Sequence, residues 1–269
     1  MTWLWFGLGF YLLFVAALFF FQRQLLYYPD AERPDPRRTP LPGLEVVRVE
    51  GGEGLTLEHW FVPPPSAAAP VVVVFHGNAG HIGHRADKYR FLVEAGSGLL
   101  LAEYRGYGGN PGAPEEPGMT ADGSALLAWL AERGVAPART WLYGESLGSG
   151  LAVKLAAAAE PPLAGVILEA PYTSIAAVAQ AHYWYVPAKW LVKDRWDAAS
   201  RIAAIRAPLL ILHGERDRTV PTRFGRALFE AAVEPKEALW LPRVSHNDVL
   251  DSSEARQRVL AFLTEGPID

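Results

Sequence analysis

Short, uninterrupted apolar runs recur along the middle of this 269-residue chain, and they leave few architectures open to it. Each run is too short for a helix and alternates little between apolar and polar residues, which is typical of parallel strands buried on both faces. The runs lie at residues 71–75, 98–101, 141–143, 165–168 and 209–212. They predict a central sheet that is covered on both sides.

Longer stretches that are compatible with helices separate these runs, at residues 83–95, 119–133, 147–159, 222–233 and 253–263. Two alternating segments precede the first run, at 44–50 and 55–62, and predict half-exposed antiparallel strands; a last strand is expected at 238–241. We therefore predict an α/β fold with a mostly parallel central sheet, helices on both faces and a short helical cap. Ligands of such sheets bind at the carboxyl ends of the strands, so functional residues are sought directly after each run.

The N-terminus carries 19 consecutive residues without a charge, from position 3 to position 21. A helix of this length covers roughly 28 Å, close to the ~30 Å hydrocarbon core of a bilayer. A cleaved signal peptide is the alternative, but it requires an early basic stretch, and no Lys or Arg precedes Arg23. We predict one transmembrane anchor over residues 1–22.

Aromatic and basic residues flank this apolar segment. Trp3 and Trp5 at one end, with Tyr27 and Tyr28 at the other, fit the aromatic belts of a membrane-spanning helix. The basic residues lie on the C-terminal side alone, namely Arg23, Arg33, Arg37 and Arg38. The positive-inside rule then favours a globular domain in the cytoplasm.

A proline-rich segment follows, with five prolines between positions 29 and 42. Because proline fixes φ and lacks a donor, we expect an extended juxtamembrane linker over residues 23–43 and one globular domain over 44–269. Lys plus Arg number 25 against 29 Asp plus Glu, so the chain lacks the positive field that nucleic acids require. The absence of cysteine excludes disulfides, thiolate-bound zinc, iron–sulfur clusters and thiol nucleophiles.

The third apolar run leads into Gly144-Glu145-Ser146-Leu147-Gly148. A Gly-x-Ser-x-Gly between a strand and a helix is a nucleophile elbow, in which a tight turn projects the serine hydroxyl into the cleft. Residues two positions on either side of Ser146 must then lack side chains. We predict that Ser146 is a nucleophile, with the amides at the start of the following helix facing developing negative charge.

A serine nucleophile needs a base, and the base needs a carboxylate that orients it. Behind a nucleophile elbow the chain order is serine, acid, histidine. Asp217 follows the run at 209–212 at the position of the acid; its competitor Glu215 is expected to face solvent or to pair with an arginine. His246 is the only histidine after Asp217, and we interpret Asp248 as a loop or helix-start residue.

Acyl transfer also needs two backbone N–H groups for the oxyanion. Leu147, directly after the nucleophile, is expected to give one, and the loop after residues 71–75 the other, through Asn78 or alternatively Ala79. Three histidines in this region, His76, His81 and His84, raise the question of a metal site. No carboxylate ligand set accompanies them in the loop, so no metal or other cofactor is predicted.

The segment at 103–112 is rich in glycine but does not fit a dinucleotide-binding loop, because Pro111 stands where glycine is needed. We interpret it as one wall of the cleft, with Tyr107 as a substrate contact or, like Arg105, as a structural residue.

Seven blocks in the right order resemble the α/β-hydrolase superfamily, and in particular its membrane-anchored single-pass serine hydrolases, which include protein-depalmitoylating thioesterases. The blocks are QRQLLYYP, FHGNAG, YRGYG, GESLGSG, LEAPYTSI, LLILHGERDRTVP and SHND. The resemblance implies Ser146, Asp217 and His246 as the triad and Asn78 with Leu147 as the oxyanion hole. Two departures are Asn110, where serine is common, and Val244-Ser245 before the histidine, where glycine is common.

Residues 170–206, where this fold inserts a cap, are rich in Tyr and Trp. We expect Tyr183 and Trp184 to line a pocket for an acyl chain; the alternative is that these rings only pack the cap against the core. The resulting hypothesis is a membrane-anchored serine hydrolase that cleaves acyl esters or thioesters, with a lipid or a lipidated protein as substrate. The alternatives are a serine peptidase of the same fold and a catalytically silent, membrane-anchored binding scaffold.

Overall fold

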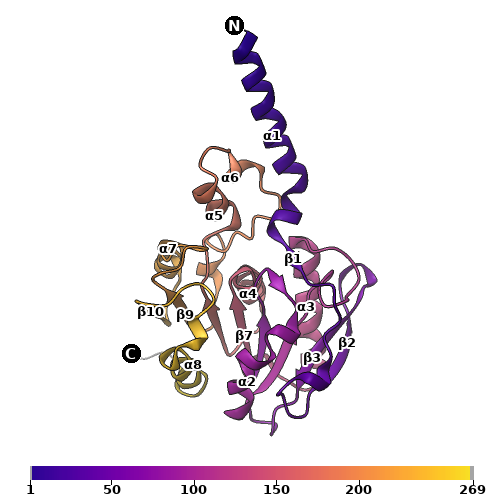
Figure 1. Ribbon diagram of the computed structural model, residues 1–269. Helices are drawn as coiled ribbons and strands as arrows, with labels where there is room; N and C mark the ends of the chain where they lie inside the picture. Colours follow the sequence, from indigo (N-terminus) through magenta and orange to yellow (C-terminus); the bar gives the residue numbers. More distant parts are fainter. Residues whose placement is uncertain (1, 267–269) are drawn as a thin grey trace.

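A computed structural model describes residues 2–266 of the chain. Its centre is one eight-stranded sheet with the order β10-β9-β8-β7-β4-β6-β3-β2 (Figure 1). The strands are β2 (Glu45–Glu50), β3 (Thr56–Val62), β4 (Val71–Phe75), β6 (Gly98–Ala102), β7 (Thr140–Glu145), β8 (Gly165–Glu169), β9 (Leu209–Gly214) and β10 (Lys236–Leu241). Neighbours from β10 to β6 pair in parallel, whereas β3 and β2 are antiparallel, which confirms the predicted α/β fold.

Helices cover both faces of this sheet because successive side chains of each buried strand point to opposite sides. In β4, Val71 and Val73 face one hydrophobic core and Val72 faces the other. The first core is closed by α3, α4 and α7, and the second by α2 and α8. The helices are α1 (Thr2–Leu26), α2 (Ala86–Glu94), α3 (Glu116–Glu132), α4 (Leu147–Ala158), α5 (Ile175–His182), α6 (Ala188–Leu191), α7 (Arg223–Ala231) and α8 (Ser253–Glu265).

The ends of two helices differ from the sequence prediction for local reasons. Helix α3 begins three residues earlier than expected, at Glu116, because Pro117 in its first turn loses no intrahelical hydrogen bond and has a φ suited to a helix. Helix α2 begins later, at Ala86, because a short 3-10 turn, Ile82–His84, occupies the preceding residues.

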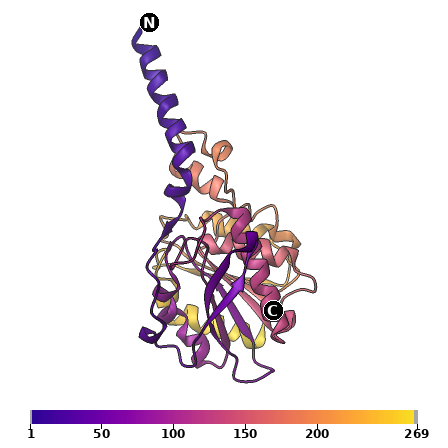
Figure 2. The ribbon, with the colours of Figure 1, turned by 90° about the vertical axis from the view of Figure 1, so that its right-hand side faces the viewer.

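Helix α1 projects from the globule, and the cap lies beside its lower half in both views (Figures 1 and 2). None of its side chains is buried, and it is long and apolar enough, by length and composition, to cross a membrane. The helix continues to Leu26, beyond the boundary expected at residue 22. Its last turn is held on the globule because Arg23 forms ion pairs with Asp194 and Glu115, each at 2.8 Å.

The proline-rich segment after α1 is not extended throughout, because it contains a short 3-10 turn, Pro36–Arg38, and it packs into the fold instead of acting as a free spacer. Strand β1 (Tyr28–Pro29) pairs in parallel with β5 (Ala79–Gly80). The preceding Tyr27 is buried, and its hydroxyl accepts a hydrogen bond from Trp196 Nε1 at 3.1 Å. The segment directly after α1 is therefore attached to the loop that follows β4.

Candidate active site

Ser146 lies in the turn between β7 and α4, at the carboxyl edge of the sheet. Its backbone has φ 48° and ψ −112°, a conformation that L-residues adopt only where the surroundings impose it. The two flanking glycines explain the local requirement. A Cβ on Gly144 would lie 2.6 Å from the Ser149 Cα, and one on Gly148 would collide with the carbonyl of Phe75.

The structure brings together the three side chains that the sequence placed after three different strands. The imidazole Nε2 of His246 lies 2.9 Å from Ser146 Oγ, and its Nδ1 lies 2.6 Å from Asp217 Oδ2. Because an ionised carboxylate only accepts, the hydrogen of the neutral ring is on Nδ1, and Nε2 is free to accept the serine proton. The arrangement can therefore move a proton from the hydroxyl to the ring.

Asp217 is buried and receives several donors. Its Oδ1 accepts the backbone N–H groups of Thr219 and Val220, each at 2.8 Å, and Oδ2 also lies 3.2 Å from His213 Nε2. Burial raises the pKa of this carboxyl, but the hydrogen bonds from His213 and His246 outweigh burial and hold the pKa well below its usual range. The carboxylate is thus ionised wherever the protein is folded at neutral pH. His213, which the sequence analysis did not single out, belongs to this arrangement.

The two carboxylates that the sequence did not favour as the acid of the triad, Glu215 and Asp248, make other contacts. Glu215 is exposed and forms an ion pair with Arg226 at 2.6 Å, as one of the two outcomes expected for it. Asp248 contacts the hydroxyl of Ser245 and precedes a 3-10 turn, so it is the loop residue that the sequence indicated.

The backbone N–H groups of Asn78 and Leu147 are the candidates for an oxyanion hole. The amide of Leu147 is the first of α4, and the first amides of a helix have no intrahelical partner. The amide of Asn78 has no hydrogen-bond partner within residues 2–266. Asn78, Leu147 and Ser146 line the same cavity, whereas Ala79, the alternative donor, does not.

Three hydrogen bonds fix the loop that carries Asn78. Its side-chain Nδ2 donates to the carbonyl of Leu26 at 2.9 Å, and its carbonyl accepts from the amide of Tyr28 at 2.9 Å and from the hydroxyl of Tyr107 at 2.8 Å. Of these partners, Leu26 is the last residue of the membrane-helix candidate α1, and Tyr28 lies directly after the helix. This placement also corrects the expectation for Tyr107: its ring is fully buried behind the loop and does not line the cavity.

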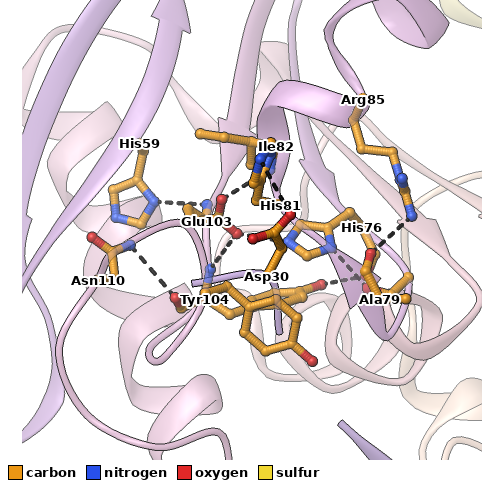
Figure 3. Close-up of polar contacts among 12 residues, drawn as sticks. Asp30, His59, His76, Ala79, His81, Ile82, Arg85, Glu103, Tyr104 and Asn110 are labelled. Atoms are coloured by element: carbon orange, nitrogen blue, oxygen red, sulfur yellow. Dashed lines mark hydrogen bonds and ion pairs between the residues drawn. The ribbon is translucent and has the colours of Figure 1, made fainter. Parts of the chain in front are cut away.

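A buried polar cluster supports the same loop from behind (Figure 3). His76 Nε2 lies 2.9 Å from Glu103 Oε1, and Glu103 Oε2 accepts the amide of Ile82 at 2.8 Å. The amide of Glu103 donates to His59 Nδ1 at 3.1 Å, and burial lowers the pKa of His59 to about 3. His76 is therefore engaged in holding the loop.

The other two histidines of the loop meet a carboxylate that comes from the linker. Asp30 Oδ2 lies 3.8 Å from His81 Nε2 and 4.0 Å from His84 Nε2 (Figure 3). The sequence analysis missed Asp30 because it is distant along the chain. The two rings stack with their centroids 3.8 Å apart and an angle of 20° between their planes. Their in-plane lone pairs therefore lie in two nearly parallel planes instead of converging on one ion.

A second charged network below the elbow was also missed. Glu145, the residue before the nucleophile, accepts from Arg85 at 3.1 Å and from the hydroxyl of Tyr89 at 3.0 Å. Glu169, at the end of β8, accepts from Lys88 at 2.8 Å, and its backbone carbonyl accepts the amide of Ser146 at 2.8 Å. The sequence signal that could have indicated this network is a glutamate at the end of each of two apolar strands, β7 and β8.

A cavity of about 490 Å³ opens in front of Ser146, within the ~300–1,000 Å³ range of small-molecule sites. Its walls come from three parts of the chain: the sheet edge, the cap and the lower part of α1. The α1 and cap side chains that line it are mostly apolar, namely Leu18, Phe19, Gln22, Arg23, Leu25, Leu26, Ile175, Val178, Ala179, His182, Tyr183, Val186, Ala188, Leu191, Val192 and Asp194. Tyr183 lines the cavity as expected. Trp184 does not: it is 79% exposed and points away from the cavity, which corrects the prediction for that residue.

Comparison with known proteins gives a consistent result. A family model described as serine aminopeptidase, S33, matches residues 66–199. An uncharacterized protein of Mycobacterium tuberculosis is 40% identical over 248 residues, which cover 91% of this chain and 88% of that protein.

The lysophosphatidylserine lipase ABHD12 of Danio rerio is 34% identical over 196 residues, 66% of this chain and 51% of the lipase. The chain therefore matches about half the length of that enzyme. Among solved structures, the Pyrococcus furiosus esterase PF2001 superposes with a TM-score of 0.70 at 18% identity, covering 88% of this chain and 97% of the esterase, and this likeness concerns the fold alone.

Proposed function

The chain belongs to the α/β-hydrolase superfamily, among its abhydrolase-domain proteins, and on this premise we propose that it is a membrane-anchored serine hydrolase that cleaves carboxylic esters or thioesters. The observation that carries the proposal is the hydrogen-bonded series Ser146–His246–Asp217, whose serine lines a mostly apolar cavity.

In the proposed mechanism Ser146 Oγ attacks the carbonyl carbon of the substrate while His246 Nε2 takes its proton. The negative charge on the carbonyl oxygen is stabilised by the amides of Asn78 and Leu147. His246 then returns the proton to the leaving alcohol or thiol, and Asp217 stabilises the charged ring in between. Water, deprotonated by His246, releases the acyl group from Ser146 and regenerates the enzyme.

The cavity supports a substrate with an acyl chain. Its apolar lining from α1 and the cap would remove a hydrocarbon chain from water, at roughly 25 cal/mol per Å² of buried apolar surface. A 34%-identical relative is named for the lipid lysophosphatidylserine, which supports a lipid ester. We therefore place lipid esters and lipidated proteins at the head of the candidate substrates.

Helix α1 supports the proposed anchoring. We propose that residues 1–22 anchor the chain, that 23–43 connect the anchor to the globule and that 44–269 form the hydrolase domain with its cap near 170–206. All four arginines close to the helix lie on the side of the globule, which supports a cytoplasmic location for the domain.

A peptidase is the second candidate, because the matching family model is described as a serine aminopeptidase. An aminopeptidase needs a negative group for the substrate's amino terminus. The one carboxylate among the lining residues, Asp194, is already bound by Arg23, with N–O distances of 2.8 and 3.1 Å. This pairing favours an ester or thioester over a peptide with a free amino terminus.

Labelling with a fluorophosphonate probe tests the proposal. We expect the parent protein to be labelled and Ser146→Ala not to be. Ser149→Ala is the matched control, because Ser149 lies three residues further on, is fully buried and has no hydrogen-bond partner for its hydroxyl within residues 2–266. Equal labelling of the parent and Ser146→Ala would refute the assignment of Ser146 as the nucleophile.

A further inference from the structure

The turn between the two cap helices, with the first residues of α6, forms a tip at residues 183–190 that lies against the middle of α1. We call these residues the cap tip. The hydroxyl of Tyr11 donates to the carbonyl of Tyr185 at 2.9 Å, and the rings of Phe14 and Tyr185 stack with centroids 6.5 Å apart. Further down, Gln22 Oε1 accepts the amide of Lys193 at 2.6 Å. The cap therefore follows α1 upward from its foot to residue 11 (Figures 1 and 2).

The position of this contact along α1 determines where the cap tip lies relative to a bilayer. From Phe21, the end of the uncharged run, to Tyr11 the helix rises ten residues, or roughly 15 Å at ~1.5 Å per residue. The uncharged run of residues 3–21 covers roughly 28 Å, so a hydrocarbon core of ~30 Å takes up the whole run and places Tyr11 near its middle. With that run across the bilayer, the cap tip, which contacts Tyr11 and Phe14, enters it as well.

The side chains of the cap tip suit such a position. Trp184 and Trp190 are 79% and 75% exposed, and Tyr183 and Tyr185 are also exposed. Tryptophan and tyrosine concentrate at membrane interfaces because their rings are apolar while each carries one polar group. No acidic residue occurs between positions 175 and 193, whereas Lys189 and Lys193 do, so the charge complements anionic headgroups.

Polar groups in lipid need partners within the protein, and side chains supply such partners to part of the backbone of the tip. Gln180 Nε2 donates to the carbonyls of Tyr183 at 3.5 Å and Val186 at 3.0 Å, and its Oε1 accepts the amide of Lys189 at 3.2 Å. The carbonyl of Tyr185 accepts from Tyr11, a residue of the membrane-helix candidate. One glutamine and one tyrosine thus supply partners for four backbone groups of this exposed turn.

We infer that the cap tip inserts into the lipid leaflet nearest the globular domain, beside α1, with anionic phospholipid as its partner. The inference rests on the proposed anchoring by α1. Its consequence concerns the route of the substrate: the cavity lies between α1 and the cap, so an acyl chain passes from the leaflet to Ser146 without crossing water.

Depth measurement in a bilayer tests the inference. The chain has no cysteine, so one introduced cysteine is a unique labelling site. The full-length protein is placed in nanodiscs of phosphatidylcholine and phosphatidylglycerol with an environment-sensitive fluorophore at Trp184→Cys, at Phe6→Cys on α1, or at Ser66→Cys in the exposed turn before β4. Nitroxides on the acyl chains report contact with lipid, and iodide reports contact with water.

We expect the probes at 184 and at 6 to lose most of their emission to the lipid nitroxides and little to iodide, and the probe at 66 to behave in the opposite way. Water-like behaviour at 184 with lipid contact at 6 would overturn the insertion of the cap while leaving the anchor intact. Water-like behaviour at both would overturn the insertion and the anchor together. The same depths in a Ser146→Ala background separate this result from the proposed catalysis, and Trp190→Cys checks that the depth at 184 is not a local effect of the substitution.

Discussion

The wall of the cavity that carries Ser146 and the wall formed by α1 and the cap differ in how their side chains are held. On the sheet side, each group follows a parallel strand, and Asp217 alone contacts four donors. On the other side the lining is mostly apolar. The polar contacts between α1 and the cap are few, and their α1 residues are Tyr11, Gln22 and Arg23. Proton transfer tolerates displacements of only ~0.5 Å, whereas burial of a hydrocarbon chain needs area without fixed direction. The first wall therefore suits chemistry and the second suits delivery of substrate.

Substitutions in the triad should have the largest effect and should act on every substrate alike. We expect His246→Ala and Asp217→Asn each to lower kcat on a soluble short-chain ester by about 10⁴-fold or more, because the serine loses its base or the base loses its orientation. Steady-state kinetics measure the effect. Asp248→Asn, in the same loop, should retain activity within a few-fold, and a comparable loss there would contradict the assignment of the acid.

The oxyanion donors should give the next largest effect. Asn78→Pro removes the backbone N–H and should lower kcat by ~10²–10³-fold. Asn78→Ala keeps that N–H and loses only the side-chain contact with Leu26, so it should lose much less. Thermal unfolding of both variants checks that they fold, and equal kcat values for the two would argue against a donor role for this amide.

Substitutions in the wall formed by α1 and the cap should act differently, since their effect depends on the substrate. Val178 and Ile175 line the cavity on the cap side. Val178→Trp should fill the acyl site and lower kcat/KM by roughly 10–100-fold for a long-chain ester, while an acetate ester is affected only a few-fold. A series of p-nitrophenyl esters measures the difference. If all chain lengths fall equally, the cavity does not hold the acyl chain, and the contrast between the two walls is lost.

The last expected effect concerns stability behind the chemical wall, and not the chemistry itself. Burial lowers the pKa of His59 from 6.5 to about 3, so the folded chain does not take up a proton there until the pH is low. Above pH 6.5 neither state holds this proton. Below it the unfolded chain binds the proton first, so stability falls with decreasing pH by at most ~1.4 kcal/mol per pH unit until about pH 3.

Replacement by a side chain that does not titrate should remove this slope. We expect His59→Gln to be less sensitive than the parent to acidification between pH 6.5 and pH 4, as measured by the urea midpoint at each pH. Parallel curves for the two proteins would show that the histidine does not contribute to acid sensitivity.

Much of the fold was accessible from the sequence because its signals are local. An apolar run indicates a buried parallel strand, and the predicted strand at residues 71–75 begins and ends at the same residues as β4. The elbow motif is also local in the sequence, and the contacts that forbid a Cβ at Gly144 arise within a few residues of Ser146, whereas those at Gly148 come from the end of β4. The roles given to the site residues stay predictions until the kinetic tests are made.

The errors and omissions have a common origin in contacts between distant segments. Tyr107 and Trp184 were placed by residue type, and packing turned the first behind the loop and the second toward the outside. Asp30 reaches His81 and His84 only because β1 pairs with β5. No local pattern reports such a pairing, since a two-residue strand carries no periodicity.

The order of apolar runs, turns and charged residues along the chain was enough to determine a parallel sheet, an elbow at Ser146 and the strand ends at which an acid and a histidine follow. Chain order does this because parallel strands bring their carboxyl ends to one edge whatever the connections between them. Only the tertiary structure decided that the cap lies along α1 up to Tyr11, that the linker holds the Asn78 loop and that these parts enclose one cavity with Ser146. These contacts join segments up to 174 residues apart, and their geometry depends on packing that no single stretch of sequence contains.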